Sequence, residues 1–335
     1  MALPKVQKAV FHDLKNNNLS IIYDSPVPAP DFRKRQHLVH VMTTSPCNNE
    51  LTWPINYPHH MDADRIPIPC NDMAGVVVEA PEDSSFQPGT AVFCRTTAAR
   101  TGDAREYTIA IESELAKKPD SLGWDEACAM PLSAETAWQC LFDKSGLAVP
   151  GSPHVDENKA KRVLITGASG SVGMWVVQLA KVAGVGQIVG LAGANSVGFV
   201  KSLGANEVVD YKAINLSTWG ESEGGKNKVD LVFDCVGGKA LGNCWSCVKE
   251  GGVLISVTDV PETFKPKDFV GNVTNFFFIM VSDGKQLEKI AELVEKGLCK
   301  PFVDSVWNFE QFQKAFDRVE LKSGLKGKVI IKVEE

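Results

Sequence analysis

The chain has 335 residues, of which 44% are hydrophobic and 23% are charged, and its formal net charge is −6. This composition is typical of a soluble globular protein that is long enough for about two domains. A mildly acidic chain without a basic stripe excludes nucleic acid and anionic lipid as main partners, since contacts to phosphate need clustered Lys and Arg.

The chain carries no sign of export or membrane insertion. Residues 1–5 lack the apolar core of a signal peptide, and no apolar run reaches the roughly 18 residues that cross a bilayer. The nine cysteines are odd in number and scattered, and several lie in apolar stretches, as reduced core cysteines do. We therefore expect a reducing compartment, the cytosol.

The first third of the chain is predicted to be a β-rich unit with long loops. Short apolar runs at 8–11, 38–41 and 75–79 are separated by clusters of Pro, Asn and Asp. From Trp124 the period changes, and apolar residues between Asp125 and Phe142 recur at helical spacing.

From Val163 onward, strands and helices alternate. The predicted strands are 163–166, 187–191, 207–209, 229–233, 253–257 and the apolar run 275–280, and the predicted helices are 172–183, 197–203 and 239–248. This alternation predicts an α/β fold with a doubly wound parallel sheet, because each parallel crossover needs a covering helix. Helices at 286–296 and 309–320 follow, and a terminal strand at 328–333 has no obvious place in that sheet.

The segment 163–173 joins a buried strand to a glycine-rich turn and then to a helix. A turn without bulky side chains lets backbone N–H groups approach a pyrophosphate, and the helix N-terminus adds partial positive charge. The alternative is a tight turn without a ligand, but the repeated strand–helix units favour a dinucleotide site. The residues expected to contact the pyrophosphate are Ser169, Gly170, Ser171 and Val172.

The choice of cofactor depends on the residues that follow the second strand. An NAD site usually has Asp or Glu there, about 20 residues after the turn, to hold the ribose 2′-hydroxyl. Residues 191–196 contain no acid, so nothing repels a 2′-phosphate, and the sequence favours NADPH over NADH. The residues expected near this phosphate are Gly193, Asn195, Ser196, Lys201 and Tyr211.

Several motifs, in the right order, resemble the medium-chain dehydrogenase/reductase superfamily on its zinc-free quinone and enoyl reductase side. The chain looks especially like the trans-acting enoyl reductases of fungal polyketide synthases. Besides the glycine turn, the motifs are 69–77, 127–131, 136–138, 202–211, 234–238 and 327–330. The resemblance implies a GroES-like catalytic domain split into 1–125 and 276–335, with a Rossmann NADP-binding domain at 126–275. It also implies cofactor contacts by Thr136, Val257, Thr258 and Lys328.

Zinc enzymes of this superfamily hold their metal with a Cys, a His and a later Cys or Asp. The resemblance places Cys47 at the first position, Asn71 at the second and Leu132 near the third. One thiolate cannot form a catalytic zinc site. The single CxxC, residues 244–247, is expected on a buried helix face, and the pair 59–60 lacks further ligands. We therefore expect no metal.

Without zinc, oxidation of an unactivated alcohol loses its Lewis acid. Hydride addition to an enone needs only a donor to the carbonyl oxygen and a proton at the α-carbon. Tyr57 and Pro58 resemble the Tyr-Pro of enoyl and quinone reductases, so Tyr57 ranks first as the donor, before His59 and His60; packing of a loop is the alternative. Cys47 and Asn48 are expected beside the nicotinamide.

The expected activity is NADPH-dependent reduction of the C=C bond of an α,β-unsaturated carbonyl compound, with polyketide-type intermediates among the substrates. A quinone reductase, a zinc-free alcohol or ketone enzyme, and a non-catalytic NADPH-binding protein are the alternatives. The expected partner is a small molecule, either free or as a carrier-bound enoyl thioester. Monomer and homodimer both stay open.

Overall fold

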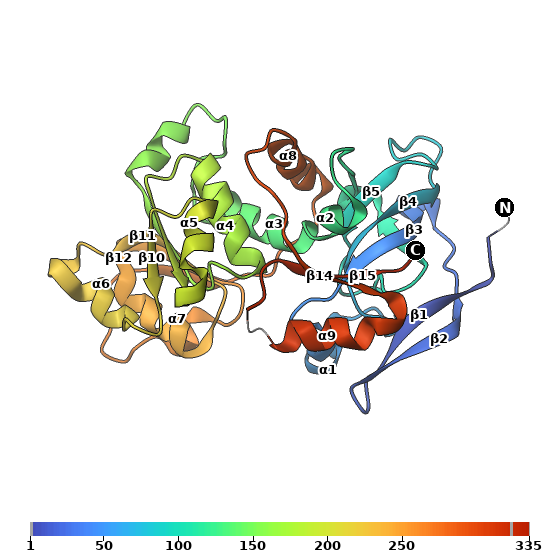
Figure 1. The fold of residues 1–335 in the computed structure, drawn as a ribbon, viewed down its shortest axis with the longest axis horizontal. Helices are drawn as coiled ribbons and strands as arrows, with labels where there is room; N and C mark the ends of the chain where they lie inside the picture. Colours follow the sequence, from blue (N-terminus) through green and yellow to red (C-terminus); the bar gives the residue numbers. More distant parts are fainter. Residues whose placement is uncertain (1–2, 322–323, 335) are drawn as a thin grey trace. The chain divides into compact units, whose positions relative to one another are not determined.

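The computed structural model describes residues 3–321 and 324–334. It contains two compact units, each with its own large sheet (Figure 1). The first unit consists of Met1–Glu135 together with Val281–Glu335, and the second is Thr136–Met280. The junctions lie slightly further along the chain than the boundaries at 125 and 275 that the motifs imply.

The first unit is built on a seven-stranded sheet of order β14-β15-β3-β4-β5-β7, with β6 paired to β3. Its strands are β3 (Gln36–Ser45), β4 (Asp72–Glu79), β5 (Ala91–Arg95), β6 (Tyr107–Ile111), β7 (Ala116–Lys117), β14 (Val303–Asn308) and β15 (Lys328–Lys332). A separate antiparallel hairpin consists of β1 (Val6–Asp13) and β2 (Asn18–Pro26). The terminal strand β15 finds its place here, antiparallel to β3 and parallel to β14.

The core of the first unit lies between its sheet and the elements packed on it. It includes Val10 of the hairpin, Val41 and Met73 of the central strands, and Ile331 of β15. Phe316 joins this core from α9, which packs against β14 and β15. The helices of this unit are α1 (Trp53–Asn56), α2 (Trp124–Cys128), α8 (Gly284–Glu295) and α9 (Phe312–Leu321), and α3 (Pro131–Trp138) leads into the second unit.

The second unit confirms the doubly wound α/β architecture. Its six-stranded sheet has the order β10-β9-β8-β11-β12-β13, and every pairing is parallel. The strands are β8 (Arg162–Ile165), β9 (Gln187–Ala192), β10 (Glu207–Asp210), β11 (Val229–Asp234), β12 (Val248–Ser256) and β13 (Thr274–Phe277). The helices are α4 (Ser171–Val182), α5 (Val197–Leu203), α6 (Leu216–Gly225) and α7 (Gly238–Cys244).

The order of the strands reverses between β8 and β11. The chain winds outward from β8 through β9 to β10, then returns to β11 and winds outward through β12 to β13. Helices α4 and α5 contact each other on one side of the sheet, and α6 and α7 contact each other on the other (Figure 1). In such sheets, ligands bind beyond the carboxyl ends of the strands at the reversal.

Two predicted helices are shorter than their patterns indicated. The pattern from Asp125 to Phe142 divides into α2 and α3 before Pro131, because proline lacks the N–H that a continuous helix needs, and a π-helical turn over Gln139–Lys144 follows. The helix predicted over 239–248 ends at Cys244, since a 3-10 turn follows it and β12 begins at Val248. In the part of the chain that the structure describes, no helix is long and apolar enough to cross a bilayer.

Candidate functional site

The glycine-rich turn follows β8 at the carboxyl edge of the parallel sheet. Gly167 has φ +58°, a left-handed value that favours glycine. A Cβ on Gly173 would lie 2.2 Å from the carbonyl oxygen of Gly167, so α4 can approach the turn only because residue 173 has no side chain.

The N-terminus of α4 presents backbone amides. Gly170 is its N-cap residue, and it has no side chain that could cap this end. The hydrogen bond from Met174 N to Gly170 O closes the first turn, so the amides of residues 171–173 precede the hydrogen-bonding pattern of the helix. This arrangement, together with the positive end of the helix dipole, fits an anion such as a pyrophosphate.

A fully buried carboxylate, Asp234, ties the turn to the ends of β11 and β12. Its Oδ1 accepts a hydrogen bond from Thr166 Oγ1 at 2.6 Å, immediately before the glycine turn. Its Oδ2 accepts from Gly237 N at 2.9 Å, from Ser256 Oγ at 3.0 Å and from Thr258 Oγ1 at 3.1 Å. One carboxylate therefore holds together three loops at the edge of the sheet where ligands bind.

Three predicted cofactor residues belong to the segments around this carboxylate. Val257 and Thr258 directly follow β12, and Val257 N donates to Asp234 O at 3.1 Å. Thr136 is the first residue of the second unit and is buried on α3.

The residues predicted near the 2′-phosphate follow β9 and β10. A Cβ on Gly193 would lie 3.7 Å from Tyr211 Oη, so the ends of these two strands meet. Asn195 and Ser196 form part of the 3-10 turn Ala194–Ser196, and Lys201 is exposed on α5. The structure thus brings Gly193 and Tyr211 together and leaves Lys201 on a solvent-facing surface of the same unit.

In the first unit, the predicted cofactor residue Lys328 forms a buried ion pair. Its Nζ lies 2.8 Å from Asp72 Oδ2 and donates to Pro46 O at 3.4 Å. The other carboxylate oxygen of Asp72 accepts from Leu132 N at 2.8 Å. Burial alone would lower the pKa of Lys328, but attraction to the Asp72 carboxylate raises it above its ordinary value. Lys328 is therefore a permanently charged residue that is held by Asp72.

The segment after β3 contains Cys47 and Asn48. Burial raises the pKa of the Cys47 thiol to about 11, although the Lys328 ammonium opposes this shift, so the thiol is protonated at neutral pH. The Oδ1 atom of Asn48 is buried and accepts no hydrogen bond from the residues that the structure describes. A buried acceptor left open in this way fits the amide group of a ligand.

Tyr57 and His59 lie on an exposed part of the same segment. Helix α1 ends at Asn56, and a 3-10 turn covers Pro58–His60. The Tyr57 side chain is 56% exposed, and its ring centroid lies 6.3 Å from that of His60. Loop packing therefore uses less than half of the Tyr57 surface.

The residues of the first unit do not fit a catalytic zinc ion. A catalytic zinc ion needs three protein ligands from Cys, His, Asp or Glu, and of the three expected positions only Cys47 carries such a side chain, since Asn71 and Leu132 occupy the other two. At the second position, Asn71 donates its amide hydrogens to Thr96 Oγ1 at 3.3 Å and to the Thr97 carbonyl at 3.4 Å. Within 3–321 and 324–334, no three Cys, His, Asp or Glu side chains come together in a way that could hold a metal ion.

The CxxC pair of the second unit gives no second candidate for a metal. Cys244 and Cys247 are both buried, and Cys247 Sγ donates to the Leu216 carbonyl at 3.4 Å. Burial raises the pKa of the Cys247 thiol to about 12. Both residues are core thiols, as a buried helix face implied.

Sequence reasoning missed three residues that organise these regions. Asp234 and Asp72 both lie in quoted motifs, yet their partners come from distant segments and no local pattern identifies them. Glu50 stands three residues after Cys47, where no motif singles it out, and its side chain is buried.

Known proteins resemble the chain along nearly its whole length. A family profile described as zinc-binding dehydrogenase matches residues 203–331. A protein of Arthroderma benhamiae named probable zinc-binding oxidoreductase, mitochondrial, is 46% identical over 333 residues, which cover 99% of this chain and 98% of that protein. The 2-methylene-furan-3-one reductase of Solanum lycopersicum is 29% identical over 322 residues, which cover 92% and 74% of the two chains.

The fold has close counterparts among solved structures. The quinone oxidoreductase of Coxiella burnetii has a TM-score of 0.81 at 21% sequence identity, and the match covers 98% of this chain and 100% of the other. At this identity the likeness concerns the fold, which combines a GroES-like unit with a Rossmann unit.

Proposed function

Because the chain belongs to the medium-chain dehydrogenase/reductase superfamily, on its quinone-oxidoreductase-like side, we propose that it reduces the C=C bond of α,β-unsaturated carbonyl compounds with NADPH. The protein is an oxidoreductase, and the family and fold predicted from its motifs are confirmed. One observation supports the finer proposal: a strand, a glycine turn and a helix N-terminus suited to a dinucleotide occur in a chain whose second zinc position is Asn71, which donates its amide hydrogens to Thr96 and Thr97.

The chain's own residues support a nicotinamide cofactor. The amides at the start of α4 would hold the pyrophosphate, and Asp234 would keep Thr258 and Gly237 in place beside it. Asn48 Oδ1 is an open acceptor for the carboxamide of the ring. NADPH is preferred in this proposal because β9 ends at Ala192 and is followed by Gly193, with no carboxylate to repel a 2′-phosphate.

The proposed chemistry is conjugate reduction. When bound, the nicotinamide supplies a hydride to the β-carbon of the substrate. Negative charge then moves to the carbonyl oxygen, where the hydroxyl of Tyr57 would donate a hydrogen bond, and a proton is added at the α-carbon. The name of the tomato relative describes the reduction of an enone, which is the same class of reaction.

A screen for oxidation of NADPH, followed by identification of the products, tests this function. Enoyl thioesters, including carrier-bound and polyketide-type ones, simple enones and quinones would be offered under the same conditions. We expect saturated carbonyl products from the thioesters or enones, at a rate that a chelator does not change. Turnover of quinones alone would favour the quinone reductase, and activity that is lost with a chelator and restored by zinc would overturn the assignment of a metal-free site. Binding of NADPH without any turnover would leave a cofactor-binding protein without catalysis.

The compartment is a second part of the proposal. None of the nine cysteines takes part in a disulfide in the described structure, which suits a reducing compartment such as the cytosol. The relative from Arthroderma benhamiae is named as mitochondrial. Fractionation of cells with an antibody to the native chain decides between the two, since mitochondrial enrichment would replace the cytosolic assignment.

A further inference from the structure

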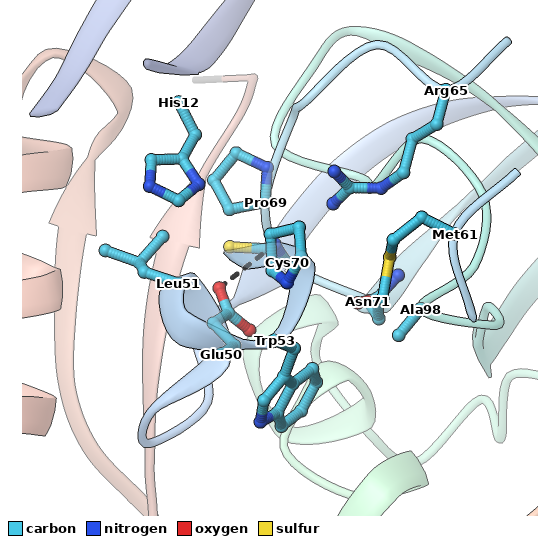
Figure 2. A pocket seen from close by; sticks show the side chains of 11 residues that line it. His12, Glu50, Leu51, Trp53, Met61, Arg65, Pro69, Cys70, Asn71 and Ala98 are labelled. Atoms are coloured by element: carbon cyan, nitrogen blue, oxygen red, sulfur yellow. Dashed lines mark hydrogen bonds between the residues drawn. The ribbon is translucent and has the colours of Figure 1, made fainter. Parts of the chain in front are cut away.

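A small recess in the first unit is lined in part by Glu50, Leu51, Trp53 and Pro54, which belong to the segment that also contains Cys47 and Tyr57. Figure 2 shows the carboxylate of Glu50 inside it, between Trp53 and Cys70. The space suffices for about one water molecule, so the recess is too small for a substrate. Its polar side chains therefore do not bind a substrate, and we ask instead how they hold the neighbouring chain segments in place.

Glu50 bridges two segments that are apart in the sequence. Its Oε2 accepts a hydrogen bond from Cys47 N at 3.0 Å, and its Oε1 accepts one from Cys70 N at 3.1 Å. The first bond fixes the start of segment 47–60, which contains Cys47, Asn48, Tyr57 and His59. The second bond fixes the turn before β4.

The backbone at Cys70 adopts a conformation that is unfavourable for a residue with a side chain. Cys70 has φ +66° and is fully buried, and a side chain in this left-handed conformation is strained. A Cβ on Gly102 would lie 2.4 Å from the Cys70 carbonyl oxygen, so the backbone here is also closely packed from the other side. The hydrogen bond from Cys70 N to Glu50 helps to hold this conformation.

Glu50 is ionisable in the range of physiological pH. Burial raises its pKa to about 7, although the two backbone N–H groups and Lys328 oppose the shift. Charged and titratable groups face it from several elements: His12 on β1, the thiols of Cys47 and Cys70, Arg65 in the loop before β4, Asp72 on β4 and Lys328 on β15. Burial lowers the pKa of His12, which lines the same recess.

We propose that Glu50 is a positioning residue that fixes segment 47–60 to the turn at Cys70, and that ionisation of its buried carboxyl group loosens this segment. The closed segment buries Glu50 and an opened one exposes it to water. A group that binds its proton more tightly in the closed form favours that form when protonated. The order of the candidate active-site segment should therefore decrease as the pH rises from about 4.5, the ordinary pKa of an exposed Glu, to about 7, its pKa in the closed segment, and should change little above that. This inference rests on the proposed function only for its effect on turnover.

Amide hydrogen exchange on the full chain tests the proposal without any substrate. After correction for the intrinsic pH dependence, exchange in peptides from residues 47–60 of the wild-type protein should accelerate by about tenfold or more between pH 5 and pH 7 and should level off above pH 7. Peptides from 163–182 in the other unit serve as the internal reference and should not change. In Glu50→Gln, which cannot ionise, the pH dependence of 47–60 should disappear. In Glu50→Ala, which leaves both N–H groups without an acceptor, exchange should be faster at every pH.

The matched control is Glu114→Gln. Glu114 is as buried as Glu50 and also accepts two backbone N–H groups, from Thr97 and Ile111; unlike Glu50 it forms an ion pair, with Arg100 at 2.6 Å, and it is remote in sequence from segment 47–60. This variant should keep the wild-type pH dependence of 47–60. Unchanged exchange in Glu50→Ala, or the same pH dependence in Glu50→Gln as in the wild type, would overturn the proposal. If neither variant folds, a wild-type segment that is indifferent to pH is enough to reject it.

The kinetic arm separates this inference from the proposed function. If the protein reduces enones, opening of the segment should lower kcat/KM in the wild type as the pH rises from about 5 to about 7, and Glu50→Gln should lack this fall. If no substrate is reduced, the proposed function fails while the exchange experiment still decides the role of Glu50.

Discussion

Lys328 Nζ and Asp72 Oδ2 lie 2.8 Å apart, and their side chains are only 6% and 1% exposed. The two residues come from β15 and β4, so the ion pair joins the last strand of the chain to the centre of the first unit. An ion pair removed from water in this way keeps its charge only while both partners are present, because a single buried charge is costly.

Lys328→Met should therefore lower the free energy of unfolding by about 3–5 kcal/mol. Urea denaturation measures the loss. The control is Lys249→Met, which removes a partly exposed pair with Asp230 and should cost less than about 1 kcal/mol. Equal losses in the two variants would show that burial of the Lys328 pair contributes nothing.

Gly170→Glu should abolish binding of NADPH. The substitution places a carboxylate at the N-terminus of α4, where the amides are expected to meet the pyrophosphate. Gly170→Ala is the matched control: its Cβ would lie 3.2 Å from the Gly167 carbonyl oxygen, which requires only a small adjustment and adds no charge. Fluorescence titration with NADPH measures both, and unchanged affinity in Gly170→Glu would remove the turn from the cofactor site.

The parts of the fold that could be predicted are those that are determined by residues close together in the sequence. The strand–turn–helix at 163–173 follows from neighbouring residues, and the strands of the parallel sheet follow from short apolar runs between breakers. The apolar run at the end of the chain predicts the terminal strand but not its place beside β3. That place depends on the pairing of Ile331 with Thr44, which are separated by most of the sequence. The helix predicted over the CxxC is too long because nothing in the sequence of Trp245–Val248 distinguishes a further helical turn from a 3-10 turn and the start of a strand.

The candidate site divides in the same way. The glycine turn carries its own signal, since glycine is required where φ is positive or where a Cβ has no room. The residues that hold the site together have no such local signal. Asp234 and Glu50 are single acids, and their importance comes from the backbone amides and hydroxyl groups that the fold places beside them. A buried acid in a polar run cannot be told from a solvated one before the partner segments are known.

Gly193→Asp should shift the cofactor preference from NADPH toward NADH. A side chain at this position is accommodated, because a Cβ would lie 3.7 Å from Tyr211 Oη in ordinary contact. A carboxylate there would repel a 2′-phosphate and could accept a hydrogen bond from a 2′-hydroxyl. We expect the affinity for NADPH to fall by about tenfold or more and that for NADH to fall less.

The control for this change is Gly193→Asn, which has the same shape without the charge. It should leave the ratio of the two affinities close to that of the wild type. If Gly193→Asp and Gly193→Asn shift the ratio equally, then shape and not charge governs the choice, and the argument for NADPH from the missing acid is wrong.

Tyr57→Phe should lower turnover far more than it lowers affinity for NADPH. The substitution removes one hydroxyl from a side chain that is 56% exposed, so the fold has little to lose. Loss of a donor to an oxygen that becomes negative during the reaction typically costs about 100- to 1000-fold in kcat. Steady-state kinetics with the substrate found in the screen, together with NADPH titration, separate the two effects.

The matched control is Tyr211→Phe, which removes the hydroxyl of a similarly exposed tyrosine in the other unit, where the 57% exposed side chain is expected near the 2′-phosphate. This variant should show the opposite pattern, with weaker binding of NADPH and nearly unchanged kcat at saturating cofactor. If Tyr57→Phe turns over as fast as the wild type, Tyr57 has no part in the reaction, and His59 on the following 3-10 turn becomes the next donor to replace. A parallel loss of kcat and of NADPH affinity would instead indicate that Tyr57 orders segment 47–60 and does not act on the substrate.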